Sequence, residues 1–244
     1  MHWTLEENLR QIHWAMTLAN AEEAAICAFS ELALTGIHRR IGELAKVELV
    51  DPAVDEVRAL CARLKMGAAL GAPTFDSSGF RYITHHFIDE AGRITAAVSK
   101  RGLTDPEATF FARGSGRPVG LIQGLSCTAV ICREICDFDQ VTEDIPRGAV
   151  DLIFVPGALR QDPDKPRTDP PPYVDDMRAL AIATGAYMVQ TNWPNALNRP
   201  EESVDAGSSC VISPAGELLL RLPQQTSGVG VFTLGEKTFS WHPE

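Results

Sequence analysis

The sequence lacks the features that would mark a membrane or secreted protein. It contains no uninterrupted run of about 18 apolar residues, so no transmembrane helix is expected. Its first segment, MHWTLEENLR, carries acidic side chains where a signal peptide would carry a basic region followed by an apolar run. We therefore expect a cytoplasmic protein with no membrane partner.

Positive charge is also scarce. The 22 lysine and arginine residues are outnumbered by 32 aspartate and glutamate residues, which leaves a formal net charge of -10. A surface that binds nucleic acid needs an excess of basic side chains to neutralise phosphates. The composition therefore excludes a typical nucleic-acid-binding protein.

Cysteine is too rare for a disulfide-stabilised scaffold, with six residues in a chain of 244. Three of these thiols lie in apolar runs and are expected to be buried: Cys27, Cys61 and Cys210. The other three are clustered, a pattern that could bind a soft metal ion: Cys127, Cys132 and Cys136. Their spacing differs from the CxxC pairs of zinc and iron–sulfur sites, so we expect no metal.

The remaining composition is typical of a globular α/β protein, with 45% hydrophobic and 22% charged residues. Helical periodicity is present at Thr4–Asn20, at Asp51–Leu64 with Gly67 as its stop, and at Val174–Thr184. Strand patterns cover residues 24–29, 68–75, 81–88, 94–99, 119–123, 127–131, 151–155 and 187–192, and a final hairpin turns at 213–216. This alternation predicts layers of helices and sheets.

We expect residues 1–244 to form a single domain. The proline-rich segment Asp162–Pro172 is the clearest candidate for a boundary, but its composition equally suits a stiff surface loop. Apolar helix and strand patterns on both sides of it would need a shared core, and this chain length is ordinary for one domain.

Three reactive side chains follow predicted core strands. Glu31 comes after AICAFS, Lys100 after ITAAVS and Cys132 after TAVI. The carboxyl ends of strands in α/β sheets are where ligands commonly bind. A thiol nucleophile needs a base, and the tetrahedral adduct it forms needs a positive charge beside its oxyanion. A carboxylate, a lysine and a cysteine supply these roles, although their wide spacing cannot show that they meet.

The segments around these three residues resemble the nitrilase superfamily of carbon–nitrogen hydrolases. Residues 29–36, FSELALTG, resemble its glutamate motif, residues 99–111, SKRGLTDPEATFF, its lysine motif, and residues 131–134, ICRE, its nucleophile motif. Downstream, DLIFVPGA, RALAIATGAYMVQTNW and GSSCVISPAGELL are similar to the family's later strands in order and spacing. The resemblance thus extends over nearly the whole chain.

This resemblance implies a four-layer α-β-β-α sandwich, usually paired as a homodimer, that requires no cofactor. It implies that Glu31, Lys100 and Cys132 are catalytic, that Glu107 is a second carboxylate in the site, and that the backbone N–H of Arg133 helps to bind the oxyanion. The reaction would be hydrolysis of a small-molecule amide to a carboxylic acid and ammonia through a thioester. Because true nitrilases commonly have tryptophan at the position of Arg133, an amide is favoured over a nitrile.

Several alternatives stay open at this point. The chain could hydrolyse a nitrile or an N-carbamoyl compound, it could transfer the acyl group to an amine instead of water, or it could be a non-catalytic binding protein on the same fold. Residues in segments that border the family's substrate pocket are Arg133, Phe138, Arg167 and Trp193. Glu107 could instead be a helix-start acid, because Thr104-Asp105-Pro106-Glu107 is also a good helix N-terminus.

One departure from the family concerns the start of the fold. Family members normally have a core strand before the helix that begins here at Thr4, and this sequence shows none. We therefore expect one strand edge to lack its usual partner, so that another strand or an unusual cover must shield it.

Overall fold

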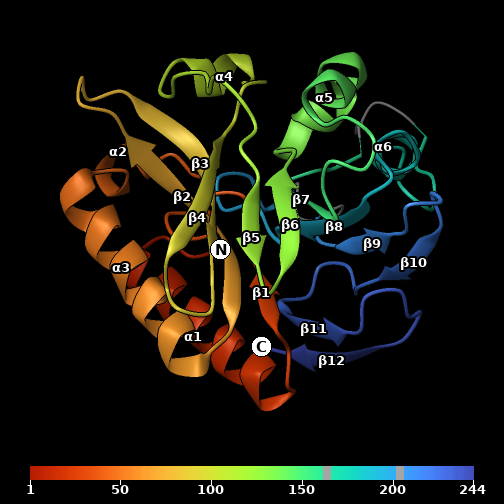
Figure 1. The fold of residues 1–244 in the computed structure, drawn as a ribbon. Helices are drawn as coiled ribbons and strands as arrows, with labels where there is room; N and C mark the ends of the chain where they lie inside the picture. Colours follow the sequence, from red (N-terminus) through yellow and green to blue (C-terminus); the bar gives the residue numbers. More distant parts are fainter. Residues whose placement is uncertain (162–165, 202–205) are drawn as a thin grey trace.

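The computed structural model describes residues 1–161, 166–201 and 206–244, which form layers of helices and sheets (Figure 1). Part of the proline-rich segment Asp162–Pro172, residues 162–165, lies outside the described residues. Its described part, residues 166–172, contains neither helix nor strand, as its proline content predicts. Within the described ranges, no helix is both long enough and apolar enough to cross a membrane.

The helices are α1 (Leu5–Ala21), α2 (Ile41–Leu44), α3 (Val47–Leu64), α4 (Asp105–Ala108), α5 (Phe138–Asp144) and α6 (Tyr173–Thr184), and a 3₁₀ helix covers Cys132–Cys136. The first strands are β1 (Ile26–Ala28), β2 (Gly67–Phe75), β3 (Arg81–Ile88), β4 (Ile94–Ser99), β5 (Gly120–Ile122) and β6 (Leu125–Ala129). The later strands are β7 (Leu152–Gly157), β8 (Tyr187–Asn192), β9 (Cys210–Ile212), β10 (Leu218–Arg221), β11 (Gly228–Phe232) and β12 (Phe239–Pro243).

Two sheets carry most of these strands. The first sheet has the order β1-β2-β3-β4, in which β1 is parallel to β2 and the other pairs are antiparallel. The second has the order β10-β9-β8-β7-β6-β5, in which β6, β7 and β8 are parallel. The hairpin β11–β12 is separate from both.

Three apolar cores fill the spaces between four layers. The first lies between α1, α3 and one face of β2, the second between the two sheets, and the third between the second sheet, α5 and α6. Strand β7 shows how alternation builds them. Phe154 faces the other sheet, whereas Ile153 and Val155 face the helices. The four-layer α-β-β-α sandwich implied by the resemblance is thus confirmed.

Helix α1 forms where the sequence predicts it. Thr4 caps its N-terminus by accepting a hydrogen bond from the backbone N–H of Glu7, and its apolar face buries Ile12, Met16 and Ala19. Full burial of an aliphatic side chain as large as Ile12 contributes about 1.5–3 kcal/mol. This burial fixes α1 against the first sheet.

The predicted start of α3 was wrong, whereas its predicted end at Leu64 is confirmed. The helix begins at Val47, so Pro52 lies inside it instead of marking its start. Val50 explains the earlier start, because its fully buried side chain extends the apolar face by one turn. Lys65, in the left-handed conformation, caps the C-terminus of the helix, and Gly67, the predicted stop, is already the first residue of β2.

Two hairpins also differ from the prediction. Strands β5 and β6 are joined by Gln123 and Gly124, both with positive φ, so Leu125 and Ser126 belong to the strand and not to the turn. The hairpin at residues 213–216 does join β9 to β10, but it is not the last one, because β11 and β12 follow it. Glycines within β11 had weakened the strand signal there.

The first sheet has an open edge at β1. In the described residues, residues 1–4 lead into α1 without forming a strand, and β1 pairs only with β2. A cavity of about 850 Å³ lies beside this edge, lined by α1, β1, β8, β11 and β12. The hairpin β11–β12 and helix α1 are therefore the elements that border the unpaired edge.

Candidate active site

Glu31, Lys100 and Cys132 come from three strand ends. Glu31 lies three residues beyond β1, Lys100 directly follows β4, and Cys132 opens the 3₁₀ helix that follows β6. Strands β1 and β4 lie on opposite edges of the first sheet, and β6 belongs to the second. The site is therefore assembled across both sheets.

Gly71 allows Glu31 to reach the site from the edge of its sheet. The segment Ser30–Ala33 lies directly over β2 at this glycine, and Leu34 donates a backbone hydrogen bond to the Gly71 carbonyl. A Cβ at position 71 would lie 2.3 Å from the Ser30 carbonyl oxygen and 2.5 Å from the Leu32 nitrogen. Because real Cβ atoms do not approach backbone this closely, only glycine permits the crossing.

Lys100 joins two carboxylates. Its Nζ donates to Glu31 Oε1 and to Glu107 Oε1, both at 2.7 Å. Lys100 is 0% exposed and Glu31 is 1% exposed, so this ion pair lies out of contact with bulk water, whereas the Glu107 side chain is 18% exposed. A buried ammonium held between two carboxylates has a fixed position and is a strong electrostatic source.

Burial and pairing set the protonation states in this group. Burial alone would lower the pKa of Lys100, but the charge of Glu31, together with Cys132 and Glu107, raises that pKa well above its ordinary value. Burial raises the pKa of Glu31 above its ordinary 4.5, and Lys100 opposes that rise. Lys100 therefore stays an ammonium ion, while the Glu31 carboxylate becomes a stronger base.

Cys132 lies beside this base. Glu31 and the backbone N–H of Ala158 both lie near enough to the Cys132 sulfur to influence the pKa values of the pair. Burial and the nearby Glu31 carboxylate raise the pKa of the thiol to about 12. The resting sulfur thus carries its proton, and Glu31 is the group in position to remove it.

The backbone at Cys132 is held in an unusual conformation. Its φ of 56° lies in the left-handed region, which costs a residue with a side chain about 1–2 kcal/mol. Cys132 lies three residues beyond the end of β6 and is the first residue of the 3₁₀ helix. This conformation separates the thiol from the alternating faces of the strand and places it at the strand exit.

Glu107 satisfies both of the readings that the sequence left open. One carboxylate oxygen completes a capping box at the start of α4 by accepting from the Thr104 backbone N–H at 2.8 Å. The other oxygen accepts from Lys100. The helix cap therefore positions the carboxylate that contacts the lysine.

Trp193 contacts the backbone of Glu31. The ring is 9% exposed, and its Nε1 donates to the Glu31 carbonyl oxygen at 2.8 Å. Trp193 and Ala158 also line a cavity of about 280 Å³, with Ile37 and Leu197 among its other walls. This cavity adjoins the Ala158 amide, which lies near the Cys132 sulfur.

The other three residues expected near the substrate do not line that cavity in the described part of the chain. The Arg133 guanidinium donates to Asp137 at 2.7 Å, one turn along the chain. Phe138 is 40% exposed at the start of α5, and Arg167 is exposed.

Two features of the site were missed in the sequence. The Ala158 amide was not expected to contact the thiol, although the segment DLIFVPGA placed it at the end of a core strand. Glu134 belongs to the segment ICRE but was given no role, and its carboxylate proves to be fully buried among hydrogen-bond donors. The sequence shows an acid two residues after the nucleophile, but only the structure shows that this acid is buried and hydrogen-bonded.

Comparison with known proteins identifies a family and similar solved structures. A family model described as carbon-nitrogen hydrolase matches residues 1–241. Among solved structures, the chain is similar to a double mutant of the amidase from Nesterenkonia sp. AN1 in complex with acrylamide, with a TM-score of 0.76, 24% identity, and coverage of 90% of this chain and 81% of that one.

A second mutant of that amidase carries the acetamide moiety of fluoroacetamide on its active-site cysteine, and its structure gives a TM-score of 0.77 at 24% identity, covering 90% of this chain and 81% of that one. The two TM-scores show that the fold is shared, and at this level of identity the likeness extends to the fold alone. A comparison with curated proteins gave no match.

Proposed function

The chain belongs to the carbon–nitrogen hydrolase family, and we propose that it is a cysteine-dependent amidase acting on a small linear amide. The observation that carries this proposal is the arrangement of one carboxylate, Glu31, in contact with both the Cys132 thiol and the Lys100 ammonium. The similar amidase structures, one in complex with acrylamide and one with an adduct at its active-site cysteine, support the same reaction class.

In the first step, Glu31 removes the proton of the Cys132 thiol as the sulfur attacks the amide carbon. The raised pKa of Glu31 brings its basicity closer to that of the thiol, so the transfer becomes less unfavourable. The protonated Glu31 then gives this proton to the leaving nitrogen. Ammonia departs and the acyl group remains on sulfur as a thioester.

The oxyanion formed in that step needs hydrogen-bond donors. The Lys100 ammonium has three N–H groups, of which two are directed to Glu31 and Glu107. The third is available for the oxyanion, together with the backbone N–H of Arg133 at the start of the 3₁₀ helix. Losing one such donor typically costs about 10²–10³ in rate.

Hydrolysis of the thioester reverses these roles. Glu31 takes a proton from water, the resulting hydroxide attacks the thioester, and the Cys132 sulfur leaves and regains its proton. Glu107 holds Lys100 in place through both half-reactions, because its second oxygen is fixed by the cap of α4. Neither half-reaction requires a metal or an organic cofactor.

The acyl part of the substrate would occupy the cavity of about 280 Å³ lined by Ala158 and Trp193. This volume suits a small acyl group. We include Arg133, Phe138 and Arg167 as residues of the outer pocket, where an arginine would favour a substrate with a distal carboxylate. Equal kcat/KM values for such an amide and its neutral isostere would contradict this selectivity.

A screen for released ammonia over amides, nitriles and N-carbamoyl compounds tests the reaction class. We expect turnover of amides, together with a mass increase on Cys132 that equals the acyl group. Turnover restricted to nitriles or carbamoyl compounds would replace the amide assignment, and no turnover with any of the three would favour a binding protein.

We also propose that residues 1–244 form one domain that pairs as a homodimer in the cytoplasm. Phe138 on α5 and Ile182 on α6 expose apolar surface on one helical layer, where a second copy could pack. A single unfolding transition and a dimeric mass in solution are the expected results.

A further inference from the structure

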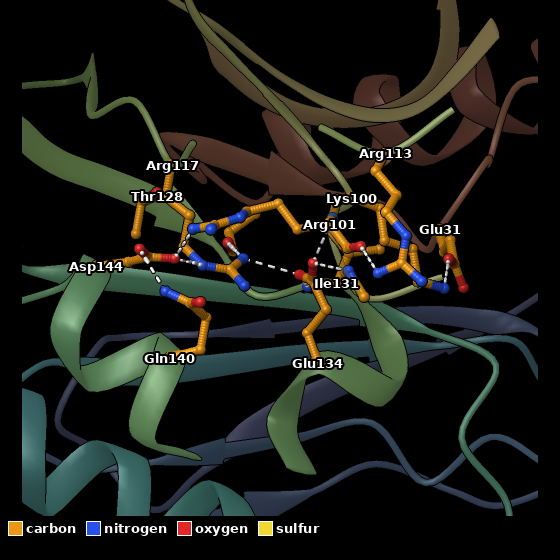
Figure 2. Close-up of polar contacts among 12 residues, drawn as sticks. Glu31, Lys100, Arg101, Arg113, Arg117, Thr128, Ile131, Glu134, Gln140 and Asp144 are labelled. Atoms are coloured by element: carbon orange, nitrogen blue, oxygen red, sulfur yellow. Dashed lines mark hydrogen bonds and ion pairs between the residues drawn. The ribbon is translucent and has the colours of Figure 1, made fainter. Parts of the chain in front are cut away.

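Glu134 connects the two halves of the site through one buried carboxylate (Figure 2). Its side chain is 0% exposed and accepts four hydrogen bonds. One oxygen, Oε1, accepts from the backbone N–H groups of Arg101 at 2.6 Å and Gly102 at 2.9 Å. The other, Oε2, accepts from the Ile131 backbone N–H at 2.7 Å and from Arg117 at 2.8 Å.

These backbone donors flank the catalytic residues. Ile131 immediately precedes Cys132, and Arg101 and Gly102 immediately follow Lys100. One carboxylate therefore ties the strand end that carries the thiol to the strand end that carries the ammonium. The two strands, β4 and β6, belong to different sheets and share no backbone hydrogen bonds.

The lysine segment packs closely against the 3₁₀ helix at Gly102. A Cβ at Gly102 would lie 3.0 Å from Glu134 Cγ and 2.8 Å from a nitrogen of Arg133. The backbone of the lysine segment at Gly102 thus packs against side chains of the 3₁₀ helix. A carboxylate with two oxygens facing opposite segments fits the gap between them.

Two arginines and a second acid complete what we term the bridging cluster: Arg101, Arg117, Glu134 and Asp144. Arg117 is buried, donates to Glu134 and also donates to the Ala129 carbonyl at the end of β6. Asp144 on α5 accepts from Arg117 and from the Arg101 side chain. Asp144 therefore supports the arginines without touching the backbone beside Lys100 or Cys132 in any contact of the described chain.

We propose that Glu134 is a positioning residue, which sets the separation between the Cys132 sulfur and the Lys100 ammonium by holding both backbone segments with one carboxylate. This inference rests on the proposed amidase function. A misplacement of about 1 Å between reacting groups can cost about 10² in rate, so removing the bridge should lower kcat without loss of substrate binding.

The variant Glu134→Gln keeps the size of the side chain but replaces one acceptor oxygen with an NH₂ group that faces other donors. We expect kcat on the best amide to fall about 10²-fold while KM stays near the wild-type value. The acid limb of the pH profile should move to higher pH, because Lys100 lowers the pKa of Glu31 and would lie farther from it. A purely structural role would lower the melting temperature without moving this limb.

Asp144→Asn is the matched control, since it makes the same acid-to-amide change in the same cluster. It should lower stability and leave kcat and the acid limb near their wild-type values. A folded Glu134→Gln protein with wild-type kcat and an unmoved limb would overturn the proposal. An equal loss of kcat in Asp144→Asn would overturn it too, because the effect would then belong to the whole cluster.

If Glu134→Gln fails to fold, the double variant Glu134→Gln/Arg117→Met also removes the buried guanidinium that would otherwise lose its ion pair with Glu134. The double variant should show the same loss of kcat, and wild-type kcat in it would overturn the proposal. Failure of the proposed function gives a different result, because the wild-type protein would then release no ammonia from any amide.

Discussion

Two buried ionic clusters lie side by side in this protein and differ in how completely their polar groups are paired. In the bridging cluster, Glu134 has four donors on its two oxygens. In the reactive cluster, formed by Glu31, Lys100 and Glu107, two of the three N–H groups of the lysine donate to carboxylates, and Glu31 lies beside the Cys132 thiol. The bridging cluster therefore stabilises the backbone arrangement, whereas the reactive cluster has groups available for proton transfer.

The pKa directions follow this difference. Burial would raise the pKa of Glu134, but Arg117 and the backbone donors outweigh it and hold that pKa below its ordinary value of 4.5. Burial raises the pKa of Glu31, and Lys100 does not fully offset the rise. Two carboxylates at similar depth therefore differ because one is saturated with donors and the other is not.

The largest effect should come from removing the thiol of the reactive cluster. Cys132→Ala should reduce turnover on the order of 10⁶-fold and abolish the acyl adduct, because no other group can form the thioester. The measurements are ammonia release and intact mass. Retained hydrolysis in the folded variant would contradict the mechanism.

Removing the cation should have the next largest effect. Lys100→Met should lower kcat by about 10²–10³, since the oxyanion loses its ammonium donor. Borohydride should trap no substrate on Lys100, because the covalent step belongs to sulfur. Near-normal kcat, or a trapped Schiff base, would show that Lys100 has a different role.

A smaller effect is expected when the second carboxylate loses its charge. Glu107→Gln should reduce kcat about 10²-fold, because Lys100 is no longer held from both sides. Kinetics and melting temperature should be measured on the same sample. A normal kcat with a slightly lower melting temperature would assign Glu107 to the helix cap alone.

The smallest and most specific effect is the pH dependence of the two clusters. Glu31 must be ionised to accept a proton, so kcat/KM should fall on acidification with a midpoint above 4.5. The stability contributed by Glu134, whose pKa is depressed, should be complete above 4.5 and be lost only as pH falls below it.

The difference in unfolding free energy between wild type and Glu134→Gln, measured against pH, tests the prediction for the stability contributed by Glu134. Coincident midpoints for activity and for this stability difference would erase the distinction between the clusters.

Much of this fold could be predicted because its strands alternate clearly. The bounds predicted for residues 81–88, 94–99 and 187–192 are those of β3, β4 and β8. The start of α3 could not be read, because Pro52 looks like a first-turn residue and the burial of Val50 depends on tertiary packing. Strand β11 was missed because its glycines hide the period of two.

The members of the reactive cluster could be named from motifs, but their contacts could not. Nothing in the sequence shows that the segment after β1 crosses β2 at Gly71, and without that crossing Glu31 would lie at the far edge from Lys100. The role suggested for Arg133 depended on a side-chain direction, and its pairing with Asp137 is a local choice that spacing allows but does not determine.

The assembly of the site across both sheets also has a kinetic consequence for folding. Glu31 and Lys100 are separated by 69 residues, and Glu134 is separated from Gly102 by 32. Contacts this distant in sequence require the closure of a long loop, which has an entropic cost. They therefore form later than the local hairpins. In a refolding experiment, the return of activity would therefore report the docking of one sheet onto the other. The circular dichroism signal of the helices and strands would recover before activity.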